Sequence, residues 1–82
     1  MAHAIFYGTV LIIIPGQMAT HLILRDAFKN TSHRLIVPNH LLPKLRPHLN
    51  HGDYLELICE ITGTHDQVHF TVQTWETNRR VA

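Results

Sequence analysis

One segment decides the fold of this chain: LLPKLRPHLNHGDYLELICEI, residues Leu41–Ile61. Its second half alternates apolar and polar side chains, which is the period of a half-buried β-strand. The side chains on the apolar face are Leu55, Leu57, Cys59 and Ile61. Before them, Gly52 and Asp53 form a pair that is typical of a tight turn. Pro43 and Pro47 exclude a long helix in the first half, because proline has no N–H to donate. The segment therefore predicts a short helical connector, a turn and a strand.

The same alternation predicts four other strands. They run at about His3–Ile14, Met18–Asp26, His33–Val37 and Gln67–Glu76. Gly8 offers a bulge or bend in the first of them. Three strands, a helical turn and two strands follow one another, which is the element order of an oligonucleotide/oligosaccharide-binding (OB) barrel. We therefore expect an all-β fold, a five-stranded OB-fold-like barrel with a short helix between the third and fourth strands. Residues 1–77 should form one domain, followed by a tail at 78–82.

The alternation also predicts which side chains face the core. In the second strand, one face carries Met18, Thr20, Leu22 and Leu24. In the last strand, Val68, Phe70 and Val72 should point inward and Trp75 outward. Four leucines of the connector should plug the end of the barrel: Leu41, Leu42, Leu45 and Leu49.

Length and charge limit the possible functions. A chain of 82 residues has a thin core, so we expect a homo-oligomer, a dimer or larger. The apolar content of 45% and charged content of 16% fit a folded globular protein. A formal net charge of +1 is too balanced for a polybasic binder, so any site for nucleic acid must be a local patch.

Histidine and cysteine content point to the conditions in which the chain works. Eight histidines could strengthen the binding of an anionic partner as the pH falls toward about 6. The single cysteine, Cys59, cannot form an internal disulfide, which favours a reducing, cytoplasmic location. The apolar residues 4–14 end at Pro15 and Gly16 and are too short for a membrane-spanning helix, so a strand is favoured and no membrane partner is expected.

Binding of single-stranded nucleic acid needs aromatic faces for the bases and cations for the phosphates. The candidate aromatic residues are Tyr54, Trp75 and the loop residue Phe28, with Tyr7 as a further one, and the candidate cations are Arg25, Lys29 and Arg34. Arg25 and Arg34 should lie close together on neighbouring strands, with Lys29 at the tip of the hairpin. The alternative is that Trp75 and Tyr54 anchor a protein interface and that the cations are ordinary solvated surface residues.

Metal binding and catalysis have weaker support. The histidines around the connector and last turn are His40, His48, His51, His65 and His69. Strand residues four apart lie about 13 Å from each other, too far to hold one ion together. The same spacing separates Glu56 and Glu60, and no phosphate loop or nucleophile motif is present. We expect no metal, no cofactor and no enzymatic activity.

The chain resembles bacterial and phage single-stranded-DNA-binding proteins of the OB-fold type. FYGTV, residues 6–10, looks like their glycine-containing first strand, and LRPHLNHGDYLELICEITG, residues 45–63, looks like their turn into a strand. The resemblance implies binding of single-stranded DNA with little sequence preference, through aromatic residues on strands and hairpin loops. This chain ends in NRRVA, without the acidic tail by which that family recruits partners. A phage, mobile-element or accessory primosomal role in replication or recombination fits that difference.

A second resemblance is to the swapped-hairpin regulators of the AbrB type. RLIVPNHLLPKLRPHLNHGDYLELI, residues 34–58, is similar to their strand, short helix, Gly-Asp turn and strand. It implies binding of duplex DNA by a dimer through basic loops. The first 28 residues, which supply two strands that such a domain does not need, count against this alternative. A protein-interaction or assembly subunit without catalytic activity is the third hypothesis.

Overall fold

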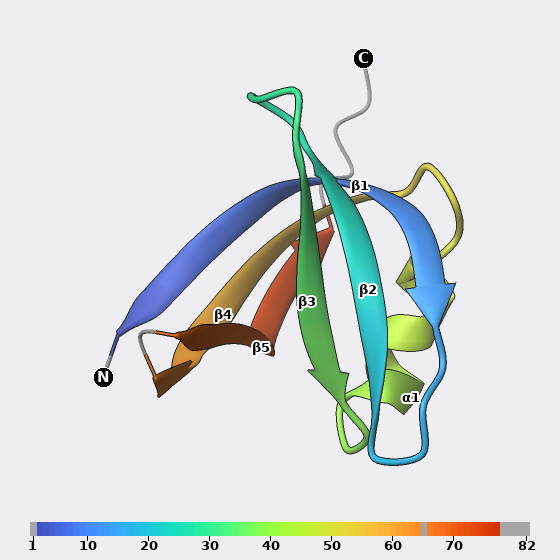
Figure 1. Cartoon of the computed structure of the whole chain (residues 1–82). Helices are drawn as coiled ribbons and strands as arrows, with labels where there is room; N and C mark the ends of the chain where they lie inside the picture. The colour runs from blue at the N-terminus through green and yellow to red at the C-terminus, as the bar shows by residue number, and fades with distance from the viewer. Residues whose placement is uncertain (1, 65, 78–82) are drawn as a thin grey trace.

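Five strands close into a barrel in the computed structural model, which describes residues 2–64 and 66–77 (Figure 1). They are β1 (His3–Ile14), β2 (Ala19–Asp26), β3 (Ser32–Pro38), β4 (Tyr54–Thr64) and β5 (Gln67–Thr77). Around the barrel the order is β1-β2-β3-β5-β4, and all neighbours are antiparallel except β3 and β5. The predicted all-β, five-stranded barrel is confirmed. His65 and the predicted tail at 78–82 lie outside the described residues.

The core includes most of the side chains that the alternation predicts to face inward on β2, β4 and β5, with others from β1 and β3, whereas Ile61, also predicted to face inward, is only half-buried. Its buried members are Phe6, Val10, Leu22, Leu24, Leu35, Val37, Leu45, Leu49, Leu55, Leu57, Cys59 and Val72. Cys59 is fully buried, and this burial raises the pKa of its thiol to about 12. It therefore packs as a small apolar residue. Met18 differs from the prediction, because β2 begins at Ala19 and the Met18 side chain is exposed.

A short helical plug covers one end of the barrel. It consists of α1 (Leu42–Leu45) and the single turn of 3-10 helix η1 (Arg46–His48), which lie between β3 and β4. A proline lies at the start of each helix, where the missing N–H removes no helical hydrogen bond. Leu45 is fully buried, and Leu41 and Leu42 pack against the core, as predicted. Figure 1 shows α1 beside the start of β2 and the end of β3.

Gly8 allows a close approach of two backbones. A Cβ atom at this position would lie 1.9 Å from the carbonyl oxygen of Arg25 on β2. The register of β1 against β2 shifts between Val10 and Ile12, so that Leu11 is the extra residue of a β-bulge. The bulge therefore lies three residues after Gly8. Gly8 itself is explained by the close approach of the β2 backbone, which leaves no room for a side chain at this position.

A second bulge changes the facing of β5. Ile58 pairs with Thr74 and Cys59 with Val72, so Gln73 is left between two register pairs. Beyond the bulge, Trp75 lies opposite the buried Leu57 and packs against the core. The prediction that Trp75 points outward is wrong, because a period of two reverses its faces where one residue is inserted.

Val68 also differs from its predicted burial. It pairs with Gly63 close to the turn between β4 and β5, and 48% of it is exposed. In Figure 1 the tip of this hairpin lies beside the N-terminus, away from β3. The end of the hairpin therefore projects beyond the core instead of covering it.

The predicted alternative of an AbrB-type domain is wrong for the fold. β1 and β2 pair with each other along their length, and β1 also pairs with β4, so both belong to the closed barrel of one chain. Within the described residues, no helix is long and apolar enough to cross a membrane.

Candidate nucleic-acid interface

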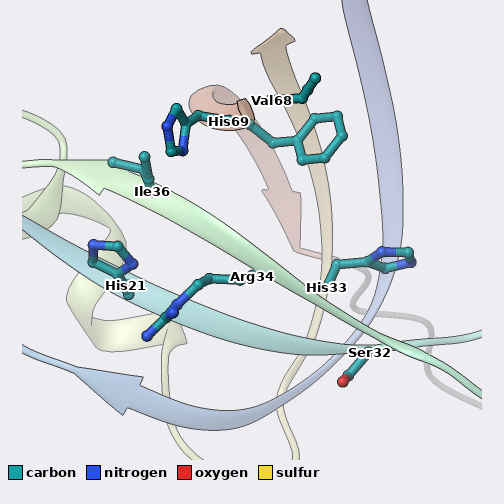
Figure 2. A pocket seen from close by; sticks show the side chains of 8 residues that line it. His21, Ser32, His33, Arg34, Ile36, Val68 and His69 are labelled. Carbon is teal, nitrogen blue, oxygen red and sulfur yellow. The ribbon is translucent and has the colours of Figure 1, made fainter. Parts of the chain in front are cut away.

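A groove of about 450 Å³ separates the outer part of β3 from the beginning of β5 (Figure 2). Its lining residues come from β2, β3 and β5: His21, Ser32, His33, Arg34, Ile36, Val68, His69 and Phe70. In the described structure β3 and β5 share one register pair, Ile36 opposite Thr71. The groove exists because the residues of β3 and β5 that precede this pair diverge from each other.

Arg25 and Arg34 lie on the outward face of the β2–β3 ladder. Arg25 is opposite Ser32, and Arg34 is opposite Ile23, so the two arginines are diagonal neighbours. Both side chains are exposed. The Arg25 guanidinium donates a hydrogen bond of 3.0 Å to Oδ1 of Asn30 in the hairpin loop. The predicted proximity of these two cations is confirmed.

Asp26 holds the loop between β2 and β3 in place. Its Oδ1 accepts hydrogen bonds from the backbone N–H groups of Phe28, at 2.7 Å, and Lys29, at 3.0 Å. Its Oδ2 lies 2.8 Å from Nε2 of His33. The hydrogen bond with His33 and then the one from Phe28 lower the pKa of the Asp26 carboxyl, which is therefore ionised at neutral pH.

Aromatic rings connect this end of the barrel to the groove. The ring centroid of Phe6 lies 4.7 Å from the ring centroid of His33 and 5.0 Å from that of Phe70. The rings of Phe6 and Phe70 meet edge to face. Phe70 is half-buried and also lines the groove. The alternation assigned Phe70 to the core. Its place in the groove lining was not predicted, because the sequence does not show where β5 separates from β3.

The aromatic residues predicted to bind bases are dispersed. Phe28 is 78% exposed at the hairpin tip, and its ring lies 5.7 Å from that of Tyr7 on β1. Tyr54 is half-buried on β4, opposite Thr9. The groove is lined by none of these aromatic residues, that is, not by Tyr7, Phe28, Tyr54 or Trp75. Of the six predicted site residues, the structure gathers Arg25, Lys29 and Arg34 on the β2–β3 side, places Phe28 at its tip and separates the other two.

Three groove histidines, His21, His33 and His69, were not predicted as site residues. His21 lies between Ile14 of β1 and Ile36 of β3, and its Nδ1 is buried without a hydrogen-bond partner. His69 of β5 is exposed, and Figure 2 shows it across the groove from His21 and Arg34. Among the described residues, no group of three or more His, Cys, Asp or Glu side chains could hold a metal ion. The hairpin that joins β2 and β3 could have placed His21 and His33 on strands beside Arg34, whereas nothing in the sequence shows that His69 of β5 lies opposite β3.

The arrangement of the strands has close parallels among solved structures. No protein-family model and no curated protein matches the sequence. The mitochondrial single-stranded DNA binding protein Rim1 of S. cerevisiae is similar in structure, with a TM-score of 0.79, 6% identity and coverage of 99% of this chain and 97% of that one. A chain of the Stn1-Ten1 complex of S. pombe gives a TM-score of 0.77 and 15% identity, over 95% of this chain but only 59% of that one. The chain has the OB-fold.

A third structure extends this likeness to a bacterial protein. The dimeric N-terminal domain of PriB from Thermoanaerobacter tencongensis matches with a TM-score of 0.64 and 11% identity, over 95% of this chain and 97% of that one. OB-folds bind oligonucleotides and oligosaccharides on the face of their second and third strands and on the loops beside it. The groove of this chain lies at that position, between β3 and the β4–β5 hairpin.

Proposed function

We propose that this protein binds single-stranded DNA with little sequence preference, without catalysis, in replication, recombination or the maintenance of a mobile element. The observation that carries the proposal is the pair of Arg34 and Phe70, a cation and an aromatic ring that line one groove at the ligand-binding position of an OB-fold. Likeness to a protein described as a single-stranded DNA binding protein supports it.

The groove offers separate partners for phosphates and bases. The cations lie on β2, on β3 and on the hairpin loop between them: Arg25, Arg34 and Lys29. There they can follow the phosphates of a single DNA strand. Phe70 in the groove and Phe28 at the hairpin tip offer ring faces for bases, which stack on aromatic side chains whatever their identity. Because the cations are few, affinity should be moderate and should fall with salt by a slope of about −0.7 per phosphate neutralised.

Fluorescence anisotropy with labelled oligothymidylate tests the proposal. The protein should bind this probe at low salt and bind a random duplex of equal length more weakly. Equal binding of the duplex would contradict a single-strand groove. Failure to bind either DNA at low salt would contradict the proposed DNA binding and favour a protein-interaction module.

Arg34→Ala should weaken binding of oligothymidylate about tenfold or more, because a hydrogen bond to a charged group contributes about 1.5–3 kcal/mol. The salt slope should become shallower by about 0.7 if one phosphate contact is lost. Arg46→Ala is the matched control, since Arg46 is an exposed arginine of the plug that does not line the groove. Equal losses in the two variants would show that only overall charge matters.

We also propose that the chain forms a homo-oligomer, through the outward face of the C-terminal half of β1. Ile12 is 56% exposed and Ile14 39% exposed on this face, and exposed aliphatic side chains on a small barrel favour association. Light scattering at micromolar concentration should give at least twice the monomer mass, and Ile12→Ser should shift it toward one chain. A monomeric wild type would contradict the proposal.

A further inference from the structure

We propose that the outer face formed by the N-terminal half of β1, by β4 and by the end of β5 binds a partner protein, through a segment in which lysine or arginine residues flank an aliphatic side chain. None of the residues that line its central hollow also lines the nucleic-acid groove. The inference is therefore independent of the proposed DNA binding.

An aliphatic pair lies at the centre of this face. Ile5 of β1 is directly opposite Ile58 of β4, and they are 54% and 40% exposed. Ile58 in turn pairs with Thr74 of β5. These residues border a hollow of about 140 Å³, large enough to take a small aliphatic side chain, with Tyr7 and Trp75 also in its lining. Burial of such a pair would remove apolar surface from water and favour association.

Carboxylates flank the aliphatic pair on both sides. In the row next to it, Tyr7 pairs with Glu56, and Glu56 pairs with Glu76. On the other side, Glu60 pairs with His3, and its Oε1 accepts a hydrogen bond of 3.2 Å from Nε2 of Gln73, the residue at the bulge. The aliphatic centre therefore lies between two acidic rows.

No lysine or arginine of these strands neutralises the carboxylates. β1, β4 and β5 together contain three glutamates and neither of the two basic residue types. The ion pair between Asp26 and His33 lies away from this face, on the groove side. The face thus attracts cations, and an aliphatic side chain flanked by lysine or arginine matches both its centre and its rim.

A second copy of the chain fits the face poorly. A two-fold contact places the same patch on both subunits, which would bring glutamates against glutamates around the isoleucines. Like charges across an interface oppose association. The charge of the face therefore favours a basic partner of different sequence.

Labelled synthetic peptides test this inference on the full chain. The probe has a leucine–valine centre between runs of lysine. One comparison peptide keeps the lysines but has a glycine–serine centre, and another keeps the centre but has glutamate in place of lysine. Anisotropy should show salt-sensitive binding of the first peptide only. This binding should be unchanged in Arg34→Ala, because Arg34 lines the groove and not this hollow.

Matched variants locate the site. Ile5→Ser should weaken peptide binding about five- to tenfold, whereas Met18→Ser, at an exposed residue that lines neither this hollow nor the groove, should leave it unchanged. Glu56→Gln and Glu76→Gln should each weaken it about two- to fivefold. The inference is overturned if the lysine peptide does not bind, if the glutamate peptide binds as well, or if Ile5→Ser acts by splitting an oligomer in light scattering. Loss of DNA binding alone would contradict only the proposed function.

Discussion

Gly8→Ala should destabilise the fold by at least about 3 kcal/mol. The added Cβ would lie 1.9 Å from the Arg25 carbonyl oxygen and 2.8 Å from its carbon. Both are backbone atoms of β2, so no side chain can rotate away, and the β1–β2 ladder must separate. Overpacking a core commonly costs about 1–3 kcal/mol even where side chains can yield. A chain of this length has about 4–12 kcal/mol of stability in total, so much of it would be lost.

Urea unfolding followed by circular dichroism measures this effect. Gly52→Ala is the control, because Gly52 has a φ of +89° but nothing within 4 Å of its Cβ position. It should cost about 1 kcal/mol, the usual penalty of a left-handed conformation for a residue with a side chain. Similar losses in the two variants would show that backbone conformation, and not contact with β2, explains Gly8.

Trp75→Ala should lower the free energy of unfolding by about 2–3 kcal/mol and leave the affinity for oligothymidylate unchanged. Truncation of a fully buried tryptophan costs about 3–5 kcal/mol, and Trp75 is only half-buried where it packs against the core. Trp75→Phe should keep most of the stability, since it retains an aromatic ring. Trp75 is the single tryptophan, so unfolding must be followed by circular dichroism.

A different result would restore the prediction from sequence. If Trp75→Ala kept its stability but lost about 1–3 kcal/mol of DNA affinity, Trp75 would be a platform for a base. Its measured role therefore distinguishes a core residue from a binding residue, which alternation alone could not do after the bulge at Gln73.

Local patterns were sufficient to predict the barrel. The alternation around Leu55 and Leu57 identified core positions that are fully buried, and the prolines of the connector correctly limited it to short helical turns. These features depend on neighbours in sequence, since side-chain facing in a strand and proline geometry are set within a few residues.

The candidate site depends on neighbours in space. Arg25 and Arg34 could be placed together because a hairpin joins their strands. Phe70 and His69 could not be placed beside Arg34, because β3 and β5 meet only after the whole of β4 has been added to the barrel. The facing of Trp75 was predicted wrongly because nothing in the sequence marks Gln73 as the extra residue of a β-bulge.

The brief contact between β3 and β5 has a consequence for selectivity. In the described structure one parallel register pair joins these strands, so the distance between the two walls of the groove is not fixed by a continuous hydrogen-bonded ladder. The β4–β5 hairpin can therefore adjust its separation from β3 without breaking inter-strand bonds on that side. If the groove binds single-stranded DNA as we propose, an adjustable width would accommodate purines and pyrimidines alike, and sequence-tolerant binding would follow from the seam of the barrel as well as from stacking.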